Sequence, residues 1–115
     1  MHVAVKAYSD VALPVLNHRR DSLLAHLVEK SVSPQLINSA VYDCLKQKKY
    51  ENAVAWAQVL NLYQPGQANY MDTLGEAYYQ ARSIEMAKYY SGLLKKLDPK
   101  APGEAIANWE RNAKR

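Results

Sequence analysis

Apolar residues recur at intervals of three and four along the central part of the chain, with polar residues between them. Between residues 34 and 67 they form two groups, Ile37, Ala40, Val41 and Cys44, then Ala53, Trp56, Ala57, Leu60 and Tyr63. Between residues 68 and 101 the groups are Met71, Leu74, Gly75 and Tyr78, then Ala87, Tyr90, Leu94 and Leu97. This spacing is typical of one face of an α-helix. Each stretch is therefore predicted to form two amphipathic helices, with breaks near residues 48–50 and 82–83.

The two stretches are copies of one pattern. Shifting the chain by 34 residues pairs four identical residues, Glu51 with Glu85, Ala53 with Ala87, Leu60 with Leu94, and Pro65 with Pro99. The chain therefore contains two predicted repeats, residues 34–67 and 68–101, and a proline is expected to end the second helix of each.

Small residues occupy positions where two helices of a hairpin are expected to meet. They are Ala53, Gly75 and Ala87. A glycine inside a helix costs about 1 kcal/mol relative to alanine. Gly75 is therefore predicted to lie where a neighbouring helix approaches closely.

The repeats resemble the tetratricopeptide repeat (TPR), whose signature is W-x2-L-G-x2-Y, then A-x3-F, then P. The second copy matches this pattern as Met71-x2-Leu74-Gly75-x2-Tyr78, then Ala87-x3-Ser91, then Pro99. The first copy keeps the spacing with Ile37, Ala40, Val41, Cys44, Ala53, Ala57 and Pro65. The resemblance implies a single all-α domain over residues 1–115, a stack of antiparallel helical hairpins that forms an α-solenoid.

The ends of the chain depart from the repeat. Residues 102–115 are predicted to form a capping helix and a basic tail, in which Ile106 and Trp109 pack inward. Residues 1–33 are interpreted as a degenerate repeat or an unrelated helical hairpin, with helices over 2–16 and 19–31. An apolar stripe on the second of these is expected, formed by Leu23, Leu24, Leu27 and Val28. Ser33 and Pro34 are a predicted cap and first-turn proline of the next helix.

In the TPR family the first helices of successive repeats line a concave groove. The matching binding residues here are Gln35, Asn38, Tyr42 and Lys46 from the first copy, with Asn69, Asp72, Glu76 and Tyr79 from the second. Amides, acids and tyrosines suit a protein or peptide partner held by hydrogen bonds and aromatic contact. One subgroup of the family clamps the carboxylate of chaperone tails, but the clamp positions hold Asn38, Tyr42, Thr73 and Ile106, which argues against that ligand.

Two adjacent tyrosine pairs, residues 78–79 and 89–90, are the other aromatic feature. Neighbouring residues on a helix point about 100° apart. Tyr78 and Tyr90 match the core positions of the pattern, so Tyr79 and Tyr89 are the freer rings, either filling gaps between hairpins or contacting a partner.

The distribution of charge along the chain raises one alternative function. Residues 1–81 carry seven Lys or Arg and seven Asp or Glu, whereas residues 82–115 carry eight and four. The excess favours a solvated basic end of the domain. Nucleic-acid binding is the disfavoured alternative, and its residues are Lys95, Lys96, Lys100, Arg111, Lys114 and Arg115.

The remaining residues offer little chemistry. Ser22 and His26 share a helix face, but no orienting acid or oxyanion donor is identifiable, so they are interpreted as a surface pair and no enzyme activity is predicted. Cys44 is expected to be buried. No metal-ligand spacing, phosphate loop or membrane-spanning run is present, so no cofactor is predicted.

The sequence therefore predicts an interaction scaffold or adaptor. A non-catalytic module of a larger enzyme or secretion assembly is the alternative. A single cysteine fits the cytoplasm, although an exported chain that has lost its leader fits equally well.

Overall fold

The computed structural model describes residues 2–97 and 104–113, and all regular secondary structure in these residues is α-helical. The predicted all-α class is confirmed. The eight described helices are α1 (His2–Ser9), α2 (Leu13–His18), α3 (Arg20–Glu29), α4 (Pro34–Lys46), α5 (Tyr50–Tyr63), α6 (Ala68–Gln80), α7 (Ile84–Leu97) and α8 (Glu104–Ala113).

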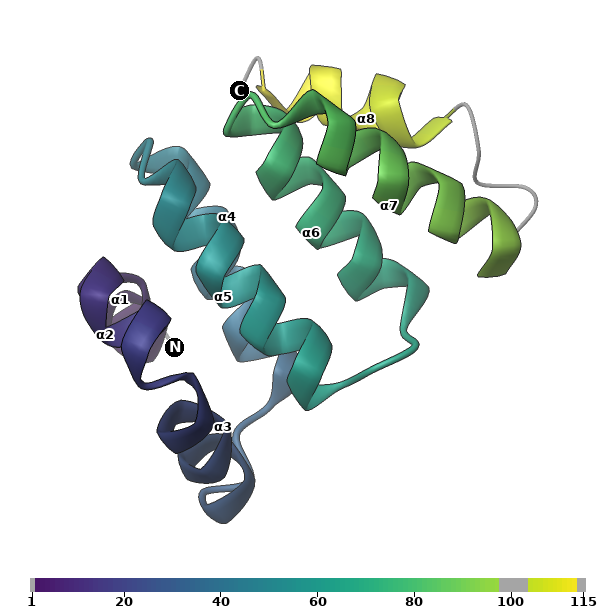
Figure 1. Cartoon of the computed structure of the whole chain (residues 1–115). Helices are drawn as coiled ribbons and strands as arrows, with labels where there is room; N and C mark the ends of the chain where they lie inside the picture. Colours follow the sequence, from purple (N-terminus) through teal and green to yellow (C-terminus); the bar gives the residue numbers. More distant parts are fainter. Residues whose placement is uncertain (1, 98–103, 114–115) are drawn as a thin grey trace.

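The helices pack as neighbouring pairs (Figure 1). Helix α4 packs on α5, α6 packs on α7, and α5 and α6 join the two pairs. Helices α1, α2 and α3 lie against the first pair, and α8 lies against α6. Each predicted repeat thus supplies one pair of helices in its described residues.

The turn inside each pair is built in the same way. Lys48 and Arg82, which are 34 positions apart, both have positive φ angles, 62° and 70°. In each turn the next residue donates its backbone N–H to a carbonyl five residues earlier, Lys49 to Cys44 at 2.9 Å and Ser83 to Tyr78 at 2.8 Å. This is the Schellman arrangement that ends helices. Both predicted breaks are therefore confirmed.

The predicted N-terminal helix over residues 2–16 is wrong, because the chain breaks into α1 and α2 between Asp10 and Ala12. The ring of Pro14 would clash with the carbonyl of residue 10 in a continuous helix. Residues of the first pair bind the carbonyls freed at the break: the Asn52 amide donates to Val11 at 3.0 Å and the Trp56 indole to Tyr8 at 2.9 Å. The N-terminal third is therefore three short helices.

Two smaller expectations also need correction. Val28 does not belong to an inward stripe, because it is exposed while Leu27 is buried and Leu23 and Leu24 are half-buried. Ser33 does occupy the N-cap position of α4, ahead of Pro34, but its hydroxyl donates to the Gln35 side chain at 2.7 Å and caps no backbone N–H.

The largest core side chains are Trp56 on α5 and Trp109 on α8. Trp109 explains Gly75, although differently from the expected contact inside the hairpin. A Cβ atom at position 75 would lie 2.6 Å from the six-membered ring of Trp109. Ala53 and Ala87 are buried as expected, Pro65 follows the end of α5, and Pro99 and Pro102 lie outside the described residues.

Candidate functional site

The eight predicted groove residues lie on α4 and α6, in two helices that contact each other. Their exposure differs widely. Gln35, Lys46 and Asn69 are exposed, and Glu76 is buried. The other four are half-buried, namely Asn38, Tyr42, Asp72 and Tyr79. We call the surface formed by these eight residues the α4–α6 face.

Hydrogen bonds join the two helices across the middle of this face. The Tyr42 hydroxyl donates to Oε1 of Glu76 at 3.1 Å, and the Thr73 hydroxyl donates to Oδ1 of Asn38 at 2.7 Å. The Gln80 amide donates to Oε2 of Glu76 at 3.2 Å. Burial raises the pKa of Tyr42 far above its ordinary value, so the hydroxyl keeps its proton and remains a donor. Asn38, Tyr42 and Glu76 therefore hold α4 and α6 together.

Helix α8 lies against the α6 half of the face. The indole Nε1 of Trp109 donates to Oδ1 of Asp72 at 2.8 Å, and the ring fills the space beside Gly75. The ring of Tyr79 lies 6.1 Å from that of Trp109, and its hydroxyl donates to Glu110 at 3.2 Å. Tyr79 is therefore less free than the sequence suggested, because α8 already uses it.

On the other side of α4, helix α1 makes a related contact. The Ser9 hydroxyl donates to Oδ2 of Asp43 at 2.6 Å, across 34 residues of sequence. Tyr42 and Glu76 are also 34 residues apart. Contacts between α1 and α4 and between α4 and α6 thus recur at the length of the predicted repeat.

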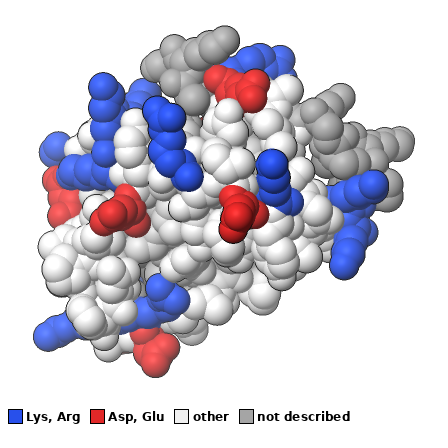
Figure 2. Space-filling view, turned by 45° about the horizontal axis from the view of Figure 1, so that its top comes forward, with Lys and Arg blue, Asp and Glu red and all other residues white. Residues whose placement is uncertain are grey.

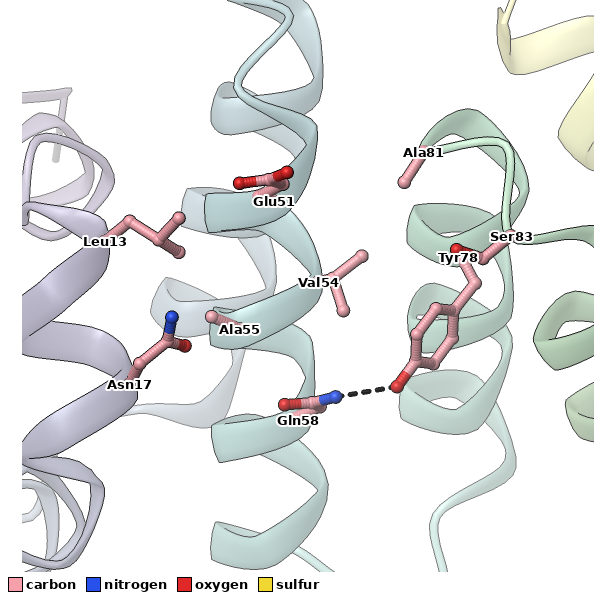
Figure 3. Close-up of a pocket in the computed structure, with 9 residues that line it drawn as sticks. All are labelled: Leu13, Asn17, Glu51, Val54, Ala55, Gln58, Tyr78, Ala81 and Ser83. Carbon is pink, nitrogen blue, oxygen red and sulfur yellow. Dashed lines mark hydrogen bonds between the residues drawn. The ribbon is translucent and has the colours of Figure 1, made fainter.

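A separate cleft of about 330 Å³ runs across α5 and was missed by the sequence analysis (Figure 3). Its walls come from α2, α5 and the end of α6, and its lining residues are Leu13, Asn17, Glu51, Val54, Ala55, Gln58, Tyr78, Ala81 and Ser83. Within it the Gln58 amide donates to the Tyr78 hydroxyl at 2.6 Å and accepts from Arg20 at 2.9 Å. No sequence signal pointed to it, because the cleft depends on where α2 packs.

Three tyrosines of α6 and α7, namely Tyr78, Tyr89 and Tyr90, form a connected set. The rings of Tyr78 and Tyr90 stack with centroids 5.7 Å apart, as their core assignment suggested. Tyr89 meets Tyr90 edge-on at 5.2 Å, and 58% of Tyr89 is exposed. Tyr89 is therefore the free ring.

Other expected features lie as follows. Cys44 is buried, and this burial raises the pKa of its thiol to about 11, which keeps it protonated near neutral pH. Ser22 and His26 are exposed on α3. Across residues 2–97 and 104–113, no three His, Cys, Asp or Glu side chains gather as a metal site. None of the helices in these ranges combines the length and apolarity that a membrane crossing requires.

Three of the six basic residues proposed for nucleic-acid binding are among the residues that the structure describes. Lys95, Lys96 and Arg111 are exposed, and Arg111 hydrogen bonds to Asn108. Lys100, Lys114 and Arg115 lie outside the described residues. Lys and Arg groups are interspersed with Asp and Glu on the face in Figure 2. That mixture lacks the continuous positive surface typical of nucleic-acid binding.

Asp72 gives a prediction that depends on pH. Burial raises the pKa of Asp72, and the hydrogen bond from Trp109 opposes this only in part. A carboxyl whose pKa is higher in the folded state binds more protons there than in the unfolded chain. The folded state is therefore destabilised as pH rises above about 4, the ordinary pKa of an aspartate. Asp72→Asn keeps an acceptor for Trp109 and cannot ionise.

We expect the Asn variant to be more stable than the unmodified chain at pH 7, and we expect the difference to disappear as pH falls below about 4. Urea unfolding of both proteins at several pH values measures this difference in the free energy of unfolding. A difference that does not change with pH contradicts the assignment.

No family model, no curated protein and no solved structure matches this chain. Inference about function therefore depends on the residues and their geometry.

Proposed function

We propose that this chain is a protein-interaction module that holds a helix or extended peptide of a partner on the α4–α6 face. The observation that carries the proposal is the docking of α8. A tryptophan inserts beside Gly75, bonds to Asp72 and contacts Tyr79. This face therefore has the chemistry to hold an amphipathic helix through an aromatic anchor.

The recurrence of turns and contacts supports the likeness to a tetratricopeptide-repeat stack. Lys48 and Arg82 take the same backbone conformation 34 positions apart. Ser9 with Asp43 and Tyr42 with Glu76 repeat the same separation. Stacked helical hairpins of this kind commonly offer an extended face to partners.

The side chains that remain available to a partner are mainly those of α4. Gln35 and Lys46 are exposed at its two ends, and Asn69 is exposed at the start of α6. Tyr42 and Glu76 are unsuitable test positions, because replacing them breaks bonds between α4 and α6 as well as any partner contact.

The test selects binding peptides from a random peptide library on the full chain and measures their affinity. Alanine at Gln35, Lys46 and Asn69 together is expected to weaken binding roughly tenfold or more, equivalent to about 1.4 kcal/mol. The matched control places alanine at three exposed residues on other elements, Asp21, Lys30 and Lys88. Selected peptides that bind both variants equally well overturn the assignment to this face.

A further inference from the structure

The cleft across α5 shares no residue with the α4–α6 face. Its floor is one face of α5, because Glu51, Val54 and Gln58 follow each other at intervals of three and four. Helix α2 forms one wall, and the end of α6 with the turn after it forms the other (Figure 3). The volume of about 330 Å³ is at the lower end of the range for small-molecule pockets, roughly 300–1,000 Å³. The cleft therefore has the size for a small ligand.

One end of the cleft contains a chain of side-chain hydrogen bonds. The chain begins at Arg20, whose Nη2 donates to Oε1 of Gln58 at 2.9 Å. Arginine can only donate, so this bond orients the Gln58 amide with its NH2 group toward Tyr78. That group donates to the Tyr78 hydroxyl at 2.6 Å. The bonds therefore run in one direction, from a cation to a hydroxyl.

The chain ends at a proton that has no acceptor in the described part of the protein. Because the Tyr78 oxygen accepts from Gln58, its own proton remains to be donated, and no described residue accepts it. Tyr78 lines the cleft and is only 9% exposed. Hydrogen bonds that run in one direction from a cation strengthen the last donor. A carboxylate that enters the cleft is the strongest acceptor for this proton.

Arg20, at the start of the same chain, also lacks a negative partner. Its Nε is buried without a hydrogen-bond partner, and both ion pairs among the described residues involve Asp10. A half-buried cation without a counter-ion is electrostatically unfavourable. A carboxylate bound at Tyr78 brings negative charge to the far end of the chain that begins at this cation. The free proton of Tyr78 and the unpaired charge of Arg20 therefore favour the same ligand group.

The other end of the cleft carries the opposite charge. Glu51 lines it from the first turn of α5, and its exposed carboxylate forms no ion pair or hydrogen bond with a described residue. Glu51 and Gln58 are seven residues apart on one helix, which separates them by about 10 Å. A fully extended chain of three residues also spans roughly 10 Å. Leu13, Val54 and Ala81 provide the apolar part of the lining.

We propose that the cleft binds a short peptide of about three residues with both ends free. The C-terminal carboxylate of the peptide accepts from Tyr78, and its ammonium group pairs with Glu51. An apolar side chain of the peptide packs on Val54. The cleft is distinct from the α4–α6 face, so either proposal can fail without the other.

The test compares the tripeptide alanyl-leucyl-alanine with its N-acetylated form and with its C-terminal amide. Isothermal titration calorimetry with the full chain measures the three affinities. Each modification removes one terminal charge, so each modified peptide is expected to bind roughly tenfold more weakly or worse. The free tripeptide is also expected to bind more weakly as salt concentration rises, because the pair with the exposed Glu51 is screened.

Two variants with matched controls locate the site. Tyr78→Phe keeps the ring that stacks on Tyr90 but removes the donor, so the affinity is expected to fall roughly tenfold. Tyr89→Phe removes a hydroxyl outside the cleft and is expected to leave the affinity unchanged. Glu51→Gln is expected to weaken the free tripeptide roughly tenfold but not the N-acetylated form. Its control is Glu85→Gln, at the equivalent exposed position of α7.

Three results overturn the proposal. They are no binding of the free tripeptide at millimolar concentration, equal affinity for the free and modified peptides, and a loss in Tyr78→Phe no larger than in Tyr89→Phe. Circular dichroism checks that each variant is folded. If Tyr78→Phe does not fold, Glu51→Gln decides the proposal, because this residue is exposed and equal losses in Glu51→Gln and Glu85→Gln contradict the site.

Discussion

Replacing Trp56 by alanine is expected to lower the free energy of unfolding by about 3–5 kcal/mol. The indole is fully buried on α5 and joins this helix to α1. It donates from Nε1 to the Tyr8 carbonyl at the end of α1 and meets the Tyr8 ring edge-on at 5.6 Å. Alanine leaves a cavity and removes one of the two hydrogen bonds to the Tyr8 carbonyl, which also accepts from the Val11 N–H at 3.1 Å. Urea unfolding followed by far-ultraviolet circular dichroism measures the loss.

Two further variants separate the causes of that loss. Trp56→Phe keeps most of the packed volume but removes the donor, so a smaller loss of about 1–3 kcal/mol is expected. Leu62→Ala truncates an exposed side chain on the same helix and is expected to change stability by about 0.5 kcal/mol or less. A Trp56→Ala loss no larger than that of Leu62→Ala contradicts the view that Trp56 anchors α1 to the first helix pair.

The central helices were predictable because local physics decides them. The three- and four-residue apolar spacing defines one buried face per helix, and the helix pairs end where that spacing stops. The turns at Lys48 and Arg82 then follow, since a helix that ends needs a residue to reverse the chain. Neither turn has the glycine that usually marks such a position, so the broken pattern was the main signal.

The N-terminal third was harder to predict because its pattern is weak and its contacts are distant. Pro14 was a visible sign that a helix over residues 2–16 must break. The break is completed by Asn52 and Trp56, which lie 41 and 48 residues from the carbonyls they bind. Periodicity along a short window carries no information about partners so far away.

The sequence predicted which residues share the α4–α6 face, but it did not predict the hydrogen bonds that they form. Spacing correctly put Tyr42 on α4 and Glu76 on α6, in helices that contact each other. It did not reveal that these two side chains bond to each other, or that Trp109 reaches Asp72. Both facts depend on how neighbouring helices are rotated and crossed, which side-chain packing decides.

Gly75→Ala is expected to destabilise the protein by about 1–2 kcal/mol, although the same change usually stabilises a helix. Alanine is the better helix former by about 1 kcal/mol. At position 75, however, the added Cβ would lie 2.6 Å from one ring atom of Trp109 and 2.8 Å from another. That ring is rigid and fully buried, so it cannot move aside cheaply. Overpacking of this kind costs about 1–3 kcal/mol, and it outweighs the helical gain.

Gly92 on α7 provides the matched control. A Cβ atom built there has no neighbour within 4 Å, and the residue is exposed inside a helix. Gly92→Ala is therefore expected to stabilise the protein by about 0.5–1 kcal/mol. The same substitution at two helical glycines is thus expected to change the free energy of unfolding in opposite directions. Urea unfolding of both variants measures the two changes.

A double-mutant cycle tests whether Trp109 is the cause. In a Trp109→Leu background the ring beside position 75 is gone, so Gly75→Ala is expected to cost about 1 kcal/mol less than in the unmodified chain. Hydrogen exchange of the α8 backbone should also speed up in Gly75→Ala, because the displaced indole loosens the helix that carries it. The contrary result is a Gly75→Ala loss in the free energy of unfolding that is the same with and without the indole. In that case the glycine serves contacts between α6 and α7, and Trp109 does not hold α8 against Asp72 and Tyr79.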